Sequence, residues 1–519
     1  MTETNSMTAA EALVRTAAAA GTELCFANPG TTEMPIVAAL DKVPGMRAVL
    51  GLHETVVTGA ADGYGRVAGK PALTLLHLGP GFANGIANLH NARRASTPIV
   101  NLIGDQASWH LAADAPLTSD IESLARPVSG WYRRSETPDS IAVDAAEALA
   151  ATRENGGQIA TLALPHDYQE AAVGGPAVPK PPATPPAIED ARIEAAAAAL
   201  RRKGATLLLG SLAMGEVGLK AAGRIAAATG CRLLNGRPIA RAERGVGLPA
   251  PAQIPYLPEQ AHATFTDTPA VVLAGASDPV TFFGWPGYGS HLIPETCDKA
   301  TLASPDEDVV GALEALAEHL GAAPFEAPPA PARPVPAEGA LAAEGLCQTL
   351  AALQPEDAIL VEESITSGWA YLGFARGAPR FTQLSITGGA IGLGPALAVG
   401  AAIAAPNRQV IDLQADGSGL YSLQALWTQA REGLNVVTVI CANRHYRILE
   451  MELQRGGLNA LGQNAAALTA LDRPTIDWTQ LARGFGVPAR RVETGEELSD
   501  ALSRALAEPG PALIEAVIP

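Results

Sequence analysis

Two β-rich runs near the carboxyl-terminal third of the chain constrain its fold more than any other feature. They cover residues 409–413 and 435–441, and a helical pattern over 420–431 lies between them. Parallel strands require a crossover connection of this kind, usually a helix. The order therefore predicts a βαβ unit. Sheets built from such units bind their ligands at the carboxyl ends of the strands.

Polar residues follow both strands of this predicted unit. Asp416, Gly417 and Ser418 come directly after the first run, and Asn443 ends the second. A carboxylate and an amide oxygen suit Mg²⁺ or Ca²⁺, whose shell a backbone carbonyl and phosphate oxygens would complete. The backbone N–H groups at Gly417 and Ser418 can approach a diphosphate closely at the start of the helix. These residues predict a site for a metal and a diphosphate.

Composition sets the size and class of the protein. A chain of 519 residues is expected to form about three domains, at roughly 150 residues each. It is 48% apolar and only 17% charged, which favours large buried cores, and its net charge of −17 argues against nucleic acid or a membrane surface as a partner. The five cysteines are scattered and are expected to be buried free thiols. No basic leader precedes an apolar run, so we expect a cytoplasmic protein.

Two Pro-rich stretches divide the sequence. Residues 174–188 and 324–337 are interpreted as linkers. They leave predicted domains at 1–173, 189–323 and 338–519. Each alternates β-rich and Ala-rich helical runs, which predicts an α/β fold with three doubly wound parallel-sheet domains.

Two motifs resemble those of the thiamine diphosphate enzymes. The Asp416-Gly417-Ser418 triplet with the later Asn443 is similar to their diphosphate-and-metal motif, although Ala415 stands where a first glycine is usual. The segment His-Glu-Thr-Val-Val-Thr-Gly-Ala-Ala-Asp-Gly-Tyr, which contains Glu54, resembles their glutamate motif. The likeness is greatest to acetolactate synthase large subunit-like and benzoylformate decarboxylase-like members. It implies pyrimidine-binding, central and diphosphate-binding domains, in that order.

The resemblance implies roles for three residues of the first domain. Glu54 would share a proton with the aminopyrimidine ring of the cofactor, and burial among its apolar neighbours would favour the protonated carboxyl. On the residues alone, Glu54 could equally be an ordinary acidic partner of a helix dipole. His77, at a strand end before a Gly-rich turn, would lie at the substrate carboxylate, although a structural role is the alternative. Thr31 falls where related enzymes carry a substrate-side serine.

The resemblance also implies cofactor contacts in the last domain. Ile391 would be the large aliphatic side chain between the two cofactor rings, and the Gly389 carbonyl would accept from the aminopyrimidine. For Ile391 a place in the core is the alternative, and for Thr366 a capping role. The implied cofactor-binding residues are Glu54, Thr366, Gly389, Ile391, Asp416, Gly417, Ser418, Asn443, His445 and Tyr446, with Asp416, Asn443 and the His445 carbonyl on the metal. The region 451–471 has an irregular pattern and is expected to form a lid.

The function implied is decarboxylation of a 2-oxo acid, such as benzoylformate, or its ligation to an aldehyde or a second acid. An acetolactate synthase acting on pyruvate is one alternative, and a family member with weak cofactor binding and no catalytic role is the other. The stretch around Phe282, Phe283 and Trp285 lacks the second histidine of benzoylformate decarboxylase-like enzymes. The central segment has no dinucleotide fingerprint, so FAD is not expected and a nicotinamide oxidoreductase is disfavoured. The resemblance further implies a homodimer or homotetramer with active sites at the subunit interface.

Overall fold

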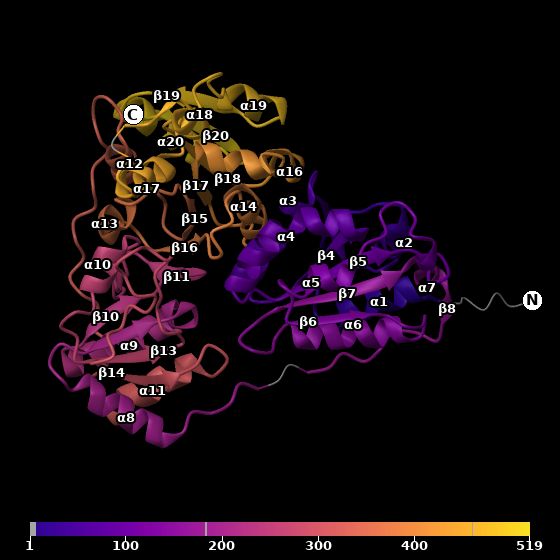
Figure 1. The fold of residues 1–519 in the computed structure, drawn as a ribbon, viewed down its shortest axis with the longest axis horizontal. Helices are drawn as coiled ribbons and strands as arrows, with labels where there is room; N and C mark the ends of the chain where they lie inside the picture. Colours follow the sequence, from indigo (N-terminus) through magenta and orange to yellow (C-terminus); the bar gives the residue numbers. More distant parts are fainter. Residues whose placement is uncertain (1–6, 182–183, 459) are drawn as a thin grey trace, which may run out of the picture. The chain divides into compact units, whose positions relative to one another are not determined.

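The computed structural model describes residues 7–181, 184–458 and 460–519 (Figure 1). The chain divides into two compact units. The first comprises residues 1–183, 334–374 and 388–519, and the second comprises 184–333 and 375–387. Both units are α/β, and the fold contains three helix-flanked parallel sheets, as the sequence predicted.

The amino-terminal sheet of the first unit has six parallel strands in the order β3-β2-β4-β5-β7-β6. Its central strands are buried along their length, as parallel strands covered on both faces must be. The short strands β1 (Met7–Thr8) and β8 (Ala172–Val173) pair separately and antiparallel. The strands are β2 (Leu24–Asn28), β3 (Arg47–Leu50), β4 (Ala72–His77), β5 (Ile99–Asp105), β6 (Trp131–Arg134) and β7 (Ile159–Pro165). The helices are α1 (Ala9–Ala19), η1 (Thr31–Glu33), α2 (Met34–Lys42), α3 (Glu54–Ala68), α4 (Leu78–Arg94), η2 (Leu111–Ala113), α5 (Ile121–Ala125), α6 (Ser140–Ala151) and α7 (His166–Glu170).

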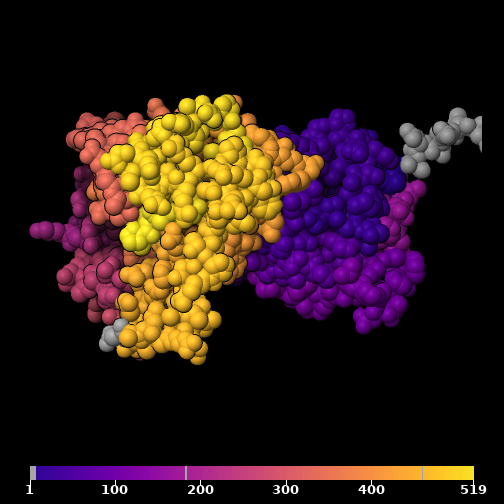
Figure 2. Space-filling model, turned by 90° about the horizontal axis from the view of Figure 1, so that it is seen from above, coloured from indigo at the N-terminus to yellow at the C-terminus, as the bar shows by residue number. Residues whose placement is uncertain are grey.

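The carboxyl-terminal sheet of the first unit contains five parallel strands in the order β15-β17-β18-β20-β19. They are β15 (Ala358–Glu363), β17 (Val410–Ala415), β18 (Val436–Ala442), β19 (Ala489–Val492) and β20 (Ala512–Val517). The helices are α12 (Ala343–Leu353), α13 (Tyr371–Phe374), α14 (Gly394–Ala404), α15 (Asp416–Gly419), η5 (Leu420–Ser422), α16 (Ala425–Glu432), α17 (Arg447–Arg455), α18 (Gln463–Thr469), α19 (Trp478–Gly484) and α20 (Gly495–Ala507). In Figure 2 the residues near the carboxyl terminus, in yellow, form a continuous, closely packed surface.

The second unit holds a parallel sheet of its own, in the order β12-β10-β9-β13-β14. The antiparallel pair of β11 with β16 also lies in this unit. The strands are β9 (Thr206–Leu209), β10 (Arg232–Asn235), β11 (Arg241–Arg244), β12 (Ala252–Gln253), β13 (Ala270–Ala274), β14 (Asp298–Ala303) and β16 (Phe381–Ser385). The helices are α8 (Asp190–Leu200), η3 (Ser211–Met214), α9 (Glu216–Thr229), α10 (Pro258–Ala263), α11 (Val309–His319) and η4 (Ala375–Gly377).

Glycines allow helices α3 and α14 of the first unit to cross closely. A Cβ on Gly63 would overlap the Leu397 carbonyl oxygen, and one on Gly400 would overlap the Ala60 carbonyl oxygen. The close crossing joins the helix that begins at Glu54 to the one that follows the Ile391 turn. The small residues of the glutamate motif are therefore needed for helix packing within one chain.

One local prediction was wrong. The single helix expected over 420–431 is divided into η5 and α16. The region 451–471, whose sequence pattern is irregular, contains the last part of α17 and all of α18. The five cysteines are free and buried, as predicted. Among the described residues, no helix is long and apolar enough to span a bilayer.

Candidate functional site

Asp416 lies at the carboxyl end of β17, and its carboxylate is held by backbone N–H groups. The Gly417 N–H donates to Oδ1 at 2.8 Å, and the Arg444 N–H donates to Oδ2 at 2.6 Å. The second bond crosses from the segment that follows β18, because β17 and β18 are neighbours in the sheet. The structure thus brings together the two strand ends that carry Asp416 and Asn443.

The surroundings of Asp416 suit a cation. The residue is only 3% exposed, and burial raises the pKa of its carboxyl to about 6, although the Arg444 and Gly417 N–H groups lower it. A bound cation would stabilise the ionised form. Within the described ranges, no group of three or more His, Cys, Asp or Glu side chains could hold a metal ion.

The segment after Asn443 closes over the same turn. The Asn443 Oδ1 accepts from the His445 N–H at 3.0 Å, and the His445 ring contacts Glu450 at 2.9 Å, so that side chain is engaged elsewhere. A Cβ on Gly417 would lie 2.5 Å from the Tyr446 ring. Only glycine at 417 lets the ring cover the start of α15.

The turn that contains Gly389 and Ile391 is shaped by glycines and held from two sides. Gly389 and Gly392 have φ angles of +77° and +92°, which favour glycine. Asn91 of α4 accepts from the Gly388 N–H at 2.9 Å and donates to the Ala390 carbonyl at 2.7 Å. Ile391 itself is half-buried, so it is not a core residue.

This turn lies next to the Asp416 turn. A Cβ on Gly392 would be 3.4 Å from the Ser418 carbonyl oxygen. Thr366 follows β15, and β15 pairs with β17 so that Glu363 stands opposite Gln414. The structure therefore gathers the predicted residues of the last domain at one end of one sheet.

Ala415 adopts an ordinary backbone conformation. Its φ and ψ angles are −80° and 144°, which any residue can adopt. The turn therefore does not require the glycine that related enzymes carry at this position.

The first domain supplies a second group of predicted residues. Glu54 is the first residue of α3 and accepts from the Asn84 side chain of α4 at 3.0 Å. It is half-buried, whereas the sequence suggested a buried carboxyl: Val56, Val57 and Ala60 face the interior, and Glu54 lies at the helix end. Thr31, the first residue of η1, is exposed.

His77 is held by a residue that the sequence did not reveal. Its Nδ1 lies 2.8 Å from Oε2 of Glu33, which is fully buried and also accepts from the Gly30 N–H at 2.7 Å. The Thr32 hydroxyl donates to Glu33 Oε1 at 2.6 Å. A Cβ on Gly81 would be 3.1 Å from Glu54 Oε1 and 3.3 Å from the His77 Cβ, so Gly81 brings these two side chains close.

Backbone strain is found beside the predicted residues of both groups. Leu78, Ile365 and Arg444 have φ angles of +50°, +54° and +60°. They adjoin His77, Thr366 and Asn443 respectively. A positive φ is rare for such residues, above all for a β-branched isoleucine, and such outliers cluster at functional sites.

The aromatic residues noted in the central segment form a cluster in the second unit. The ring centroids of Phe282 and Phe283 are 4.9 Å apart, and those of Phe283 and Trp285 are 5.7 Å apart. Tyr256 packs on Phe282 at 5.4 Å. Phe282 and Phe283 are about half exposed.

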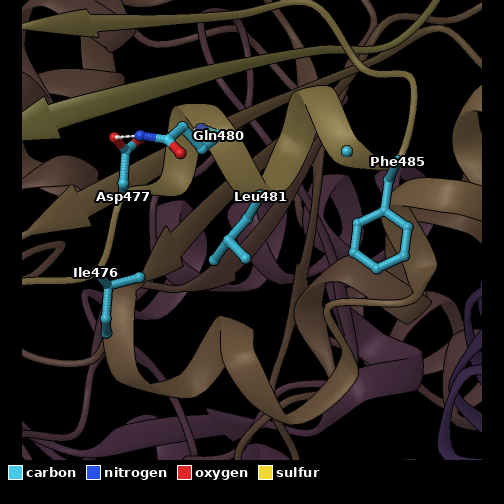
Figure 3. A pocket seen from close by; sticks show the side chains of 6 residues that line it. Ile476, Asp477, Gln480, Leu481 and Phe485 are labelled. Atoms are coloured by element: carbon cyan, nitrogen blue, oxygen red, sulfur yellow. Dashed lines mark hydrogen bonds between the residues drawn. The ribbon is translucent and has the colours of Figure 1, made fainter.

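A surface pocket of about 490 Å³ lies beside α19 (Figure 3). It is lined by Ile476, Asp477, Gln480, Leu481, Gly484 and Phe485. The Asp477 carboxylate caps the helix by accepting from the Gln480 N–H at 2.9 Å. None of the predicted site residues lines this pocket.

Comparisons with known proteins match the chain along its length. The family described as thiamine pyrophosphate enzyme, N-terminal TPP binding domain, matches residues 7–124, and the corresponding C-terminal TPP binding domain matches 365–516. A protein of Mycobacterium tuberculosis, provisionally named acetolactate synthase large subunit, is 47% identical over 99% of both chains. Benzoylformate decarboxylase of Pseudomonas aeruginosa is 29% identical over 95% of this chain and 96% of its own.

The fold is shared with solved structures. A thiamine diphosphate-dependent 4-hydroxybenzoylformate decarboxylase of Rhodococcus jostii superposes with a TM-score of 0.86, covering 99% of each chain at 24% identity. At that identity the likeness shows the fold alone.

Proposed function

Since the chain belongs to the thiamine diphosphate-dependent enzyme family, we propose that it is a Mg²⁺-dependent decarboxylase or carboligase of a small 2-oxo acid. The bound cofactor would supply a nucleophilic carbon that adds to the 2-oxo group, and a cationic thiazolium ring that accepts the electron pair left behind when CO₂ departs. The observation that carries the proposal is the meeting of three turns at one end of the carboxyl-terminal sheet. These are the turns at Thr366, Ile391 and Asp416.

The residues at these turns fit the cofactor and its metal. Asp416 and Asn443 offer hard oxygen atoms of the kind that Mg²⁺ binds, and the His445 carbonyl and diphosphate oxygens would complete its shell. Gly417, Ser418 and Thr366 would contact the diphosphate. Ile391, half-buried on a turn, would separate the two rings, and the Gly389 carbonyl would accept from the aminopyrimidine.

Glu54 and His77, the predicted residues of the first domain, would hold and transfer protons. Glu54 would hold a proton against the aminopyrimidine, which requires a side chain free to face a ligand, as its half-exposed position allows. His77 would move a proton at the substrate. The buried Glu33 carboxylate accepts from Nδ1–H of His77, which leaves Nε2 to face the substrate.

We also propose an oligomeric state and a cellular location for the protein. We expect a homodimer or homotetramer in which Glu54 of one subunit meets the cofactor held by another. The family resemblance and the half-exposed Glu54 support this arrangement. The five free, buried cysteines support a cytoplasmic location.

An acetolactate-forming carboligase acting on pyruvate is a second candidate. The name of the Mycobacterium tuberculosis relative favours it. A third possibility, weak cofactor binding without catalysis, is suggested by Ala415 and by the missing second histidine. The ordinary backbone conformation of Ala415 argues against a strained turn at that position.

The test is calorimetric titration of the protein with thiamine diphosphate and Mg²⁺, followed by assay of CO₂ release from a panel of 2-oxo acids. We expect metal-dependent binding and turnover. Glu54→Gln should retain binding and lose turnover by about 100-fold or more, the scale of general acid–base catalysis. Glu122→Gln, which alters an exposed glutamate in the first turn of α5, is the matched control and should change neither.

The products separate the candidates. Aldehyde from an aromatic 2-oxo acid supports the decarboxylase, and acetolactate from pyruvate supports the synthase. Absence of cofactor binding at millimolar concentration would contradict both.

A further inference from the structure

Three polar side chains lie inside the carboxyl-terminal sheet, directly behind the Ile391 turn. Glu363 ends β15, and Asp412 and Gln414 lie on β17. Their exposures are 1%, 0% and 0%. Parallel strands covered on both faces are normally apolar, so a buried polar cluster here requires a physical reason.

Glu363 holds the turn through both of its carboxylate oxygens. The Gly392 N–H donates to Oε1 at 2.5 Å, and the Gly394 N–H donates to Oε2 at 2.5 Å. The Gln414 side chain donates from Nε2 to the same Oε2 at 3.3 Å. Three donors on one carboxylate fix both the carboxylate and the turn.

Two oxygens of the cluster, Asp412 Oδ1 and Gln414 Oε1, have no hydrogen-bond partner among the residues that the structure describes. They converge on one place, because a Cβ on Gly394 would be 2.6 Å from Gln414 Oε1, 2.9 Å from Asp412 Oδ1 and 3.0 Å from Glu363 Oε2. Two acceptors that face the same point can pair only if one of them carries a hydrogen.

In the described part of the chain, no positively charged side chain compensates the cluster. The titratable groups that face Asp412 and Glu363 are each other, Glu362 beside Glu363 and the Cys441 thiol of β18. Helix α14, which covers them, has no titratable side chain. The described groups that shift the pKa of either carboxyl are hydrogen-bond donors and the other carboxyls, with no Lys, Arg or His among them. Two buried ionised carboxylates without a cation would be strongly destabilising.

We propose that Asp412 is a permanently protonated acid, with the hydrogen on Oδ1 donated to Gln414 Oε1. The Gln414 amide is thereby fixed with Nε2 toward Glu363, and Glu363 is the member of the pair that ionises, binding the Gly392 and Gly394 N–H groups as a carboxylate at pH 8. Asp412 and Gln414 are positioning residues: they act on the Ile391 turn only through Glu363.

The electrostatics of the pair agree with this assignment. Burial, followed by the charge of Glu363, raises the pKa of Asp412 well above its ordinary value. Burial also raises the pKa of Glu363 to about 7, against the lowering effect of the two backbone donors. The backbone N–H groups favour a charge on Glu363, so the retained proton belongs to Asp412.

Infrared spectroscopy tests the proton directly and does not depend on the cofactor. At pH 8 the full chain should show the carbonyl stretch of a protonated carboxylic acid. Asp412→Asn should remove this band, and Glu363→Gln should leave it. Loss of the band in Glu363→Gln, or an unchanged band in Asp412→Asn, would overturn the assignment. Gln414→Met, which removes the acceptor, should shift the band, and an unshifted band contradicts the proposed donation.

Cofactor affinity tests the positioning role, and this part rests on the proposed function. Asp412→Asn keeps a donor toward Gln414 Oε1 and should bind thiamine diphosphate within about threefold of the natural chain. Asp412→Ala and Glu363→Gln each leave a buried polar group unpaired, and we expect affinity to fall about 10-fold to 100-fold. Equal losses in Asp412→Asn and Asp412→Ala would refute the positioning role. If the natural chain itself fails to bind, the proposed function fails, and the infrared result still decides the location of the proton.

Discussion

Two carboxylates at the ends of neighbouring strands are held in the same way but have different surroundings. Asp416, after β17, accepts two backbone N–H groups, and so does Glu363 at the end of β15. Their exposures are 3% and 1%. Neither burial nor backbone hydrogen bonding therefore distinguishes Asp416, the carboxylate proposed to bind the metal, from Glu363, which holds the Ile391 turn.

The two carboxylates differ in their neighbours other than the backbone N–H donors. Asp416 shares its strand end with the Asn443 segment, which brings a second oxygen donor to the same turn. Glu363 is backed by Gln414 and by a second carboxyl, Asp412, inside the sheet. If Asp412 keeps its proton, as proposed above, Glu363 faces only hydrogen-bond donors and holds the backbone, whereas Asp416 lies beside an oxygen donor and can bind a cation.

The largest expected effect comes from removing Asp416. Asp416→Ala should weaken Mg²⁺-dependent binding of thiamine diphosphate by about 100-fold or more, equivalent to about 3 kcal/mol, because the metal loses its charged protein ligand. Calorimetric titration measures this loss. Asp472→Ala changes an exposed aspartate of the same unit and should leave the affinity unchanged. Equal affinities for the natural chain and Asp416→Ala would mean that the two carboxylates do not differ as described.

A smaller effect is expected from pH at Glu363. Its pKa is raised from 4.5 to about 7 in the folded chain, so its contribution to stability is complete below about pH 4.5 and is lost as pH rises through 7. The loss amounts to about 3 kcal/mol. Chemical unfolding of the cofactor-free chain between pH 5 and 8 measures it.

Glu363→Gln provides the comparison for this pH dependence. Other buried acids contribute in the same direction, so the difference between the two proteins isolates Glu363. The variant should show a shallower decline of unfolding free energy with pH. Parallel curves for the two proteins would show that Glu363 does not titrate in this range.

The sequence predicted the parts of the site that depend on neighbouring strands. Asp416 and Asn443 meet because β17 and β18 are parallel neighbours joined by a helical crossover, a connection visible in the pattern of the chain. The five free cysteines and the three parallel sheets followed from composition and alternation. Such features depend on local periodicity, which a single sequence carries.

Other features depend on contacts that no local pattern records. Glu33 supports His77 only because β2 and β4 are adjacent in the sheet, which places η1 beside the end of β4. Asp412 lies within the run 409–413 that predicts a strand, and Gln414 directly follows it. Their positions beside Glu363 depend on the register of β15 with β17. The half-buried position of Glu54 depends on which face of α3 packs on α14. Each of these features is set by tertiary contacts between segments far apart in the sequence.

The smallest expected effect concerns Ala415, between the strand that carries Asp412 and the turn that begins at Asp416. Related enzymes have glycine here, yet the φ angle of −80° needs none, and the methyl group is half-buried at the end of β17. Ala415→Gly should therefore change cofactor affinity by less than about threefold, and it should lower stability by about 0.5–1 kcal/mol because glycine is more flexible in the unfolded chain. Calorimetric titration and chemical unfolding measure the two quantities. A large gain in affinity on Ala415→Gly would show that the methyl group obstructs the diphosphate. The Asp416 turn would then fit its ligand less closely than Glu363 fits the Ile391 turn.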